Sequence, residues 1–119
     1  MGRDSGRWRR VKFRRYDIHW VSLDPTRGGE MRKTRPAVIV SLDVLNQGLK
    51  TVVVCPLTTQ LHSDWRSRLT IKLRGRFAEI AGDQIRTVSK SRFGKRIGAL
   101  SLKDAAALRR LLGEMYGAD

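Results

Sequence analysis

The densest group of chemically capable side chains lies between two apolar runs near the start of the chain. The runs cover residues 18–23 and 36–40, and the segment between them is rich in charge and contains paired glycines. The charged residues of this segment include Arg27, Glu30, Arg32, Lys33 and Arg35. Because apolar strands can hold such a loop in place, this stretch is a natural position for polar chemistry.

The two histidines and the single cysteine form no metal-ligand pattern. His19 lies in the first apolar run and is interpreted as a packing residue. His62 lies in a polar segment, where a solvated imidazole is expected and a general base is the alternative. Cys55 follows three valines, a context typical of a small core hydrophobe rather than a nucleophile. The sequence therefore predicts no metal and no cofactor.

Short β-type runs would position these side chains. The expected strands cover residues 15–23, 35–42, 51–55, 68–73, 77–81 and 96–100. The second is continuously apolar over residues 36–40, which indicates burial on both faces. In the fourth, strict alternation predicts Leu69, Ile71 and Leu73 facing inward and Arg68, Thr70 and Lys72 facing outward. Pro56 is expected to end or edge the third strand, and residues 84–92 are expected to form one irregular or 3₁₀ turn.

One C-terminal helix is expected after Ser101, whose spacing from Asp104 is that of a variant capping box. Gly117 is expected to end it. Its apolar positions are Leu102, Ala105, Leu108, Leu112 and Met115. A short helical turn is expected at 43–46. The whole pattern predicts a mainly β (α+β) fold, a twisted antiparallel sheet or partly closed barrel with the helix packed on it.

Charge and length limit the class of protein. At 119 residues the chain predicts one modest core, and its 25 basic against 11 acidic residues give +14 and a pI near 11.4. Such an excess favours a polyanionic partner, with nucleic acid first, then an acidic protein, then an anionic membrane surface. Seven of the first 15 residues are basic, which predicts a flexible arm over 1–14 and a folded domain over 15–119. With one cysteine and neither a membrane span nor a signal peptide, the expected location is the cytoplasm.

Three separated motifs resemble the MazF/PemK toxin family. The first is Asp24-Pro25-Thr26-Arg27-Gly28, followed by Glu30 and by Arg35-Pro36-Ala37-Val38. The second is Pro56-Leu57-Thr58-Thr59-Gln60, and the third is Asp83-Gln84-Ile85-Arg86-Thr87. They occur in the family's order and extend the resemblance over roughly residues 16 to 116. One departure is Tyr16, where family members usually carry glycine.

The resemblance implies a small SH3-like barrel of the CcdB/PemK type and a ribosome-independent endoribonuclease. The 2′-hydroxyl of single-stranded RNA would attack the adjacent phosphate, leaving a 2′,3′-cyclic phosphate and a 5′-hydroxyl without a metal. By resemblance, Arg35 and Thr58 are the catalytic pair, since a guanidinium and a hydroxyl can stabilise the phosphorane. Glu30 is the candidate general base, and a purely substrate-orienting role for it is equally consistent.

The same resemblance implies an RNA-binding set and protein partners. The expected RNA contacts are Arg27, Lys33, Thr59, Gln60, Gln84 and Arg86. Trp65 either stacks on a base or anchors its loop. The resemblance further implies a homodimer with RNA grooves at its interface, and an acidic, MazE-like antitoxin that covers them.

Two alternative functions remain open. A CcdB-like gyrase inhibitor would keep the fold, but the chain ends without the terminal Trp on which that activity depends. A basic nucleic-acid-binding module without catalysis is the second. At the level of single residues, Arg35 would otherwise form a structural salt bridge with Glu30 or Asp24, and Thr58 would serve as a turn hydroxyl.

Overall fold

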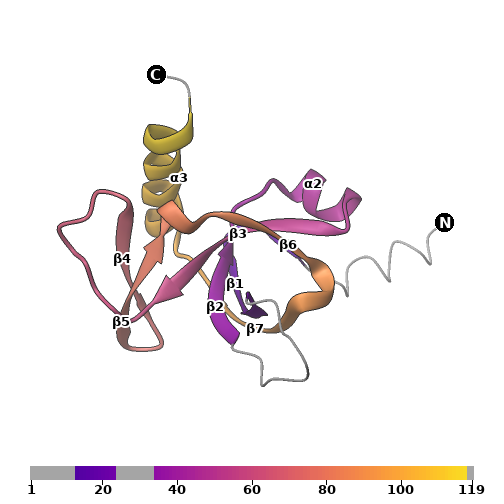
Figure 1. Cartoon of the computed structure of the whole chain (residues 1–119), viewed down its shortest axis with the longest axis horizontal. Helices are drawn as coiled ribbons and strands as arrows, with labels where there is room; N and C mark the ends of the chain where they lie inside the picture. The colour runs from indigo at the N-terminus through magenta and orange to yellow at the C-terminus, as the bar shows by residue number, and fades with distance from the viewer. Residues whose placement is uncertain (1–12, 24–33, 118–119) are drawn as a thin grey trace.

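The computed structural model describes residues 13–23 and 34–117, and their strands form one antiparallel sheet (Figure 1). The strands are β1 (Asp17–Ser22), β2 (Thr34–Ile39), β3 (Thr51–Thr58), β4 (Arg68–Leu73), β5 (Arg76–Ala81), β6 (Arg86–Ser89) and β7 (Phe93–Ala99). They run in the order β4-β5-β3-β2-β1-β7, with β6 paired to β3. The helices are α2 (Asp43–Gly48) and α3 (Leu102–Tyr116), with 3₁₀ turns η1 (Gly82–Gln84) and η2 (Lys90–Arg92). The predicted mainly β fold with a C-terminal helix is confirmed.

Strand β3 is the centre of this arrangement. One edge pairs with β2, while the other pairs first with β6 through residues 51–54 and then with β5 through Leu57 and Thr58. The expected strand covered residues 51–55, with Pro56 ending or edging it, whereas β3 continues through Pro56 to Thr58. On the edge of β3 that pairs with β6 and β5, Pro56 lies between the two paired segments. The N–H that proline lacks is therefore not needed for a strand-to-strand hydrogen bond on that edge.

Apolar side chains are buried on both faces of the sheet, as predicted for β2. Val38 and Val40 belong to a cluster that also contains Leu108 of α3, whereas Ala37 and Ile39 belong to a second cluster. This alternation follows from the two-residue period of a strand. Phe13 and Phe93 pack against the second cluster. His19 stacks on the Phe13 ring and meets the Phe93 ring edge to face, which agrees with its interpretation as a packing residue.

Helix α3 covers the first cluster and lies beside β4 and β5 (Figure 1). The Ser101 hydroxyl accepts a hydrogen bond from the Asp104 N–H at 3.0 Å, and Gly117 caps the other end, as expected. Leu108 is fully buried, but Leu102 is 91 % exposed. Leu102 thus shares the helical spacing of the buried residues without sharing their burial, because it is the first residue of the helix.

Residues 84–92 form more regular structure than expected. They contain the short strand β6 between the two 3₁₀ turns, paired with the first half of β3. Four mostly polar residues give little strand signal of their own. The burial of Val88 against the second cluster and the open edge of β3 supply the missing stabilisation.

Tyr16, at the position where the family resemblance leads us to expect glycine, has a backbone conformation that favours glycine. Its φ is +74°, in the left-handed region that costs a residue with a side chain roughly 1 kcal/mol. Two backbone hydrogen bonds hold it there, from the Tyr16 N–H to the Ile39 carbonyl and from the Leu100 N–H to the Tyr16 carbonyl. The second positive-φ site is the Arg74–Gly75 turn of the β4–β5 hairpin, as two-residue hairpins require.

Within the described ranges, no helix is long and apolar enough to cross a membrane.

Candidate active site

The pairing of β2 with β3 brings the two proposed catalytic residues together. Ala37 pairs with Pro56 and Val38 with Cys55. Continuing this register two residues toward the start of β2 places Arg35 opposite Thr58. Directly opposed residues of an antiparallel pair project from the same face of a sheet. The sheet ends here, so both side chains meet the surface: Arg35 is exposed and Thr58 half-buried.

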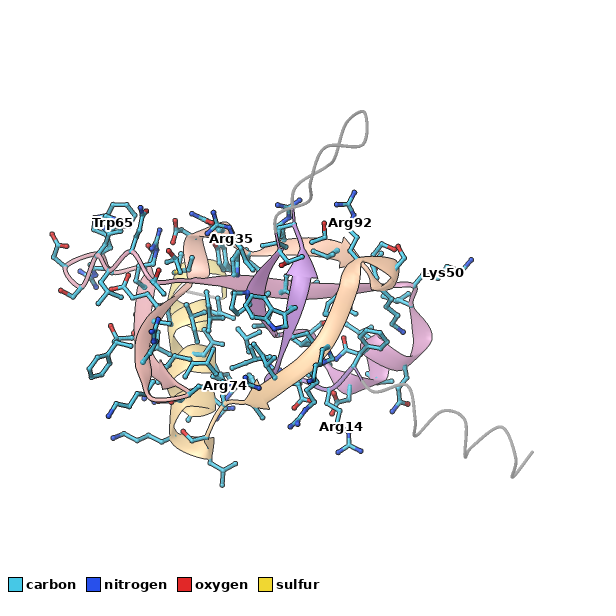
Figure 2. All side chains as sticks on the ribbon, turned by 90° about the horizontal axis from the view of Figure 1, so that it is seen from below. Arg14, Arg35, Lys50, Trp65, Arg74 and Arg92 are labelled. Atoms are coloured by element: carbon cyan, nitrogen blue, oxygen red, sulfur yellow. The ribbon has the colours of Figure 1, made fainter. Side chains whose placement is uncertain are left out.

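A pocket of about 420 Å³ opens at this end of the sheet. Five of the predicted site residues line it, namely Arg35, Thr58, Gln60, Gln84 and Arg86. The remaining lining residues are Leu23, Pro56, Leu57, His62, Arg68 and Ala81. Residues from β2, β3, η1 and β6 thus converge on one cavity, although they are distant from one another in the sequence. In Figure 2, Arg35 and Trp65 lie on the same side of the molecule, opposite Arg74 and Arg14.

Four predicted site residues are not part of this described pocket. Thr59 is exposed and does not line it. Arg27, Glu30 and Lys33 lie outside the described residues, and so does Asp24. The alternative salt bridge of Arg35 to Glu30 or Asp24 therefore stays a prediction, as does the basic arm, of which residues 1–12 also lie outside the described ranges.

The Thr58 hydroxyl has a defined orientation. Its Oγ1 accepts a hydrogen bond from the Gln60 backbone N–H at 3.1 Å. This is the contact expected of a turn hydroxyl, so that alternative describes part of its role. A hydroxyl that accepts one bond still has its O–H proton to donate. The contact therefore orients Thr58 as a donor without occupying its proton.

Arg68 was predicted to face outward, but its side chain is only 5 % exposed and lines the pocket. Two carboxylates account for the difference. Its Nε donates to Oδ1 of Asp83 at 2.9 Å, and its Nη1 lies 3.6 Å from Oε1 of the fully buried Glu79. A buried arginine is tolerated when it is paired in this way. The sequence does contain a signal for this buried ion pair. Glu79 is a lone acidic residue within the otherwise apolar end of β5, and a buried acid of this kind indicates a basic partner.

Glu79 also holds the segment between β3 and β4. Both of its carboxylate oxygens accept from the His62 backbone N–H, at 2.8 and 2.9 Å. The His62 ring stacks on the Trp65 ring at 4.0 Å between centroids and 11° between planes, and the Arg68 guanidinium lies 4.6 Å from the same indole. Trp65 is therefore a loop anchor in this structure, although it is still 44 % exposed.

The electrostatics of the pocket are cationic. Among the described residues that line it, the permanently charged side chains are Arg35, Arg68 and Arg86, and Arg68 is paired with Glu79 and Asp83. Partial burial by itself raises the pKa of Asp83. Hydrogen bonds from Arg68, Ser67 and its own backbone, with the charge of Arg68, outweigh this effect and lower the pKa overall. Asp83 therefore stays ionised at neutral pH.

Cys55 belongs to the core rather than to the site. Burial raises the pKa of its thiol to about 12, with a smaller contribution from the charge of Asp83. It is fully buried in the first apolar cluster, which confirms its interpretation as a small core hydrophobe. Among the described residues, no group of three or more His, Cys, Asp or Glu side chains could hold a metal ion.

This arrangement defines a class of protein: a small antiparallel β domain with a cationic, hydroxyl- and amide-lined pocket suited to a phosphodiester. Residues 14–116 match the family described as the PemK-like, MazF-like toxin of type II toxin-antitoxin systems. The match spans most of the chain, and the protein belongs to this family.

Individual relatives agree with this assignment. The chain is 30 % identical over 109 residues to endoribonuclease MazF9 of Mycobacterium tuberculosis, covering 84 % of this chain and 92 % of that protein. It is 35 % identical over 94 residues to endoribonuclease PemK of Escherichia coli, covering 75 % and 71 %. A mycobacterial endoribonuclease solved in complex with its cognate antitoxin shares the fold, with a TM-score of 0.76, 19 % identity and coverage of 91 % and 98 %.

Proposed function

We propose that this chain cleaves single-stranded RNA at specific sequences, without a metal, by attack of the substrate's own 2′-hydroxyl. As a member of a toxin family whose curated relatives are named endoribonucleases, the chain is an endoribonuclease toxin of a toxin-antitoxin system. The proposal concerns its chemistry. The observation that carries it is the placement of Arg35 and Thr58 at facing ends of β2 and β3, in one pocket.

In this mechanism the 2′-oxygen bonds to phosphorus and the bond from phosphorus to the 5′-oxygen breaks. The products are a 2′,3′-cyclic phosphate and a 5′-hydroxyl. The Arg35 guanidinium neutralises charge that grows on the phosphoryl oxygens, and the Thr58 hydroxyl donates to one of them. Arginine keeps its proton across the working pH range, so charge stabilisation is its main role. Glu30 is the candidate base for the 2′-hydroxyl, or else it orients the substrate.

Specificity requires groups that contact the neighbouring nucleotides. Gln60 and Gln84 line the pocket and can read the edges of unpaired bases, while Arg86 can hold a phosphate. Thr59 is exposed next to Gln60, within reach of an RNA strand that extends beyond the pocket. Arg27 and Lys33 complete the proposed RNA-binding set. Single-stranded RNA is favoured because its bases are free to be read.

Two protein partners belong to the proposal. The net charge of +14 suits an acidic antitoxin as well as RNA, so competition for the same cationic surface would inhibit the enzyme. A mycobacterial fold neighbour was solved with its cognate antitoxin.

We also propose that the protein forms a homodimer. Residues 15–119 would form the toxin domain and residues 1–14 a basic arm. The proposed location is the cytoplasm, where mRNA is available. Light scattering on the purified protein would measure the dimer directly.

The decisive experiment incubates the purified protein with a long RNA of mixed sequence in excess EDTA and maps the product ends. A matched RNA carries 2′-deoxy or 2′-O-methyl sugar at the mapped site. Discrete cleavage in EDTA that the 2′ change abolishes is the expected result, and it also reveals the recognised sequence. Binding without cleavage of either RNA would favour the non-catalytic module, and gyrase inhibition would be tested next.

A further inference from the structure

We propose that His62 is the general acid of this pocket, protonating the 5′-oxygen as its bond to phosphorus breaks. This inference rests on the proposed 2′-hydroxyl mechanism, which leaves the proton donor to the leaving oxygen unassigned. An alkoxide is a poor leaving group, so a positioned acid accelerates its departure, typically by about 10²- to 10⁴-fold.

The position of His62 is well defined for a residue between two strands. It lines the same cavity as Arg35 and Thr58. Its backbone N–H is bound by both oxygens of Glu79, a side chain with 0 % exposure on the rigid strand β5. Its ring is held flat against Trp65 at 4.0 Å. A backbone tether and a ring stack together fix the imidazole at the pocket, as a group that acts on a bound substrate requires.

Other described groups at the pocket cannot supply this proton. The guanidinium groups of Arg35, Arg68 and Arg86 retain their protons at any physiological pH. Asp83 is ionised, since its pKa is lowered, and it already accepts from Arg68. Both oxygens of Glu79 accept from the His62 N–H, and one of them lies near Arg68. Among the described lining residues, His62 alone has a side chain type that exchanges a proton near neutral pH.

The charges around His62 come from several elements. The cations are Arg35 of β2, Arg68 of β4 and Arg86 of β6, and the anions are Glu79 of β5 and Asp83 of η1. Its own segment adds Asp64 and Arg66. A bound RNA phosphate would bring one more negative charge next to the ring, which favours the imidazolium form that a general acid needs.

The proton balance of the step is complete. The 2′-hydroxyl loses its proton to the candidate base Glu30 as the bond from the 2′-oxygen to phosphorus forms. The 5′-oxygen takes a proton from the His62 imidazolium as its own bond to phosphorus breaks. After the products leave, Glu30 returns its proton to water and His62 takes one up. No oxidant, reductant or further reactant is needed.

The test compares two RNA substrates that differ in one atom. One has the normal 5′-oxygen at the cleaved phosphate, and the other has sulfur in its place. A thiolate leaves without being protonated, so the sulfur substrate does not need a general acid. Single-turnover rates are measured in EDTA for the wild-type protein, His62→Gln and Arg35→Ala. Ser63→Ala is the control, because Ser63 is exposed in the same segment and does not line the cavity.

We expect His62→Gln to slow cleavage of the oxygen substrate by about 10²-fold or more and to approach the wild-type rate on the sulfur substrate. Arg35→Ala should be slow on both, because the phosphorane needs its charge in either case. Ser63→Ala should match the wild type throughout.

Two results would overturn the role of His62 alone. Either His62→Gln cleaves the oxygen substrate at the wild-type rate, or it is equally slow on both substrates, which would indicate a structural role. Urea unfolding followed by tryptophan fluorescence shows whether the variant is folded. If the wild-type protein leaves the oxygen RNA intact in EDTA, the 2′-hydroxyl mechanism itself fails, and this inference fails with it.

Discussion

Arg68 of β4 donates a hydrogen bond from its Nε to Oδ1 of Asp83 at 2.9 Å, which fastens the 3₁₀ turn η1 to the sheet. The next residue along, Gln84, lines the pocket together with Arg68. The ion pair therefore links the pocket wall to β4. Protonation of the Asp83 carboxylate should affect both the stability of the fold and the shape of the pocket.

Acid should weaken the fold through Asp83. Its pKa is lowered in the folded state, so its contribution is fully present above its ordinary value of 3.8 and is lost as pH falls through the lower folded-state value. Because the Asp83 side chain is 34 % exposed, we expect Asp83→Asn to cost only about 0.5–1 kcal/mol at pH 7. Urea unfolding of the wild-type protein and of Asp83→Asn, measured from about pH 2 to about pH 7, gives this difference in the free energy of unfolding across the titration of Asp83. A cost that does not change with pH would contradict the assignment, and Asp64→Asn serves as the exposed control.

Removing the proposed catalytic pair should separate cleavage from binding. Arg35→Ala and Thr58→Ala should each lower the single-turnover cleavage rate by about 10²- to 10³-fold, as loss of one transition-state donor does. Affinity for RNA should fall by less than about 10-fold, since other cations hold the phosphates. Thr58→Ser keeps the hydroxyl and should stay active. Equal losses of affinity and rate would indicate a binding role instead.

Two leucines of α3 should differ greatly in their effect on stability. Leu108 is fully buried in the first apolar cluster, whereas Leu102 is 91 % exposed at the start of the same helix. Leu108→Ala should lower the free energy of unfolding by about 2–5 kcal/mol, from lost burial and the cavity left behind. Leu102→Ala should change it by less than about 0.5 kcal/mol. Urea denaturation of the pair measures both, and similar costs would refute the packing of α3 described above.

The single thiol should be inert in the folded protein. Burial raises the pKa of Cys55 to about 12, so the reactive thiolate is almost absent at pH 8. We expect Ellman's reagent to detect no thiol in native protein and one thiol per chain in denaturant. Fast labelling of native protein would show that the first apolar cluster opens readily. Activity should be unaffected by the reagent under native conditions.

Several features were determined by the sequence alone. The period-two runs, the turn residues and the Ser101 cap specify most strands and α3, because these patterns depend on local backbone geometry. The motifs around Arg35 and Thr58 were sufficient to place the chain in its family. Net charge was sufficient to favour polyanionic partners, since long-range attraction depends on total charge more than on fold.

The tertiary structure decided the features that depend on distant partners. Strand β6 forms because an open edge of β3 and a buried site for Val88 are available, and neither is visible in its four residues. Arg68 turns inward because Glu79 and Asp83 are there to pair with it. His62 enters the pocket because Glu79 binds its backbone from another strand. Local pattern cannot encode such contacts, because their energy exists only when separate segments meet.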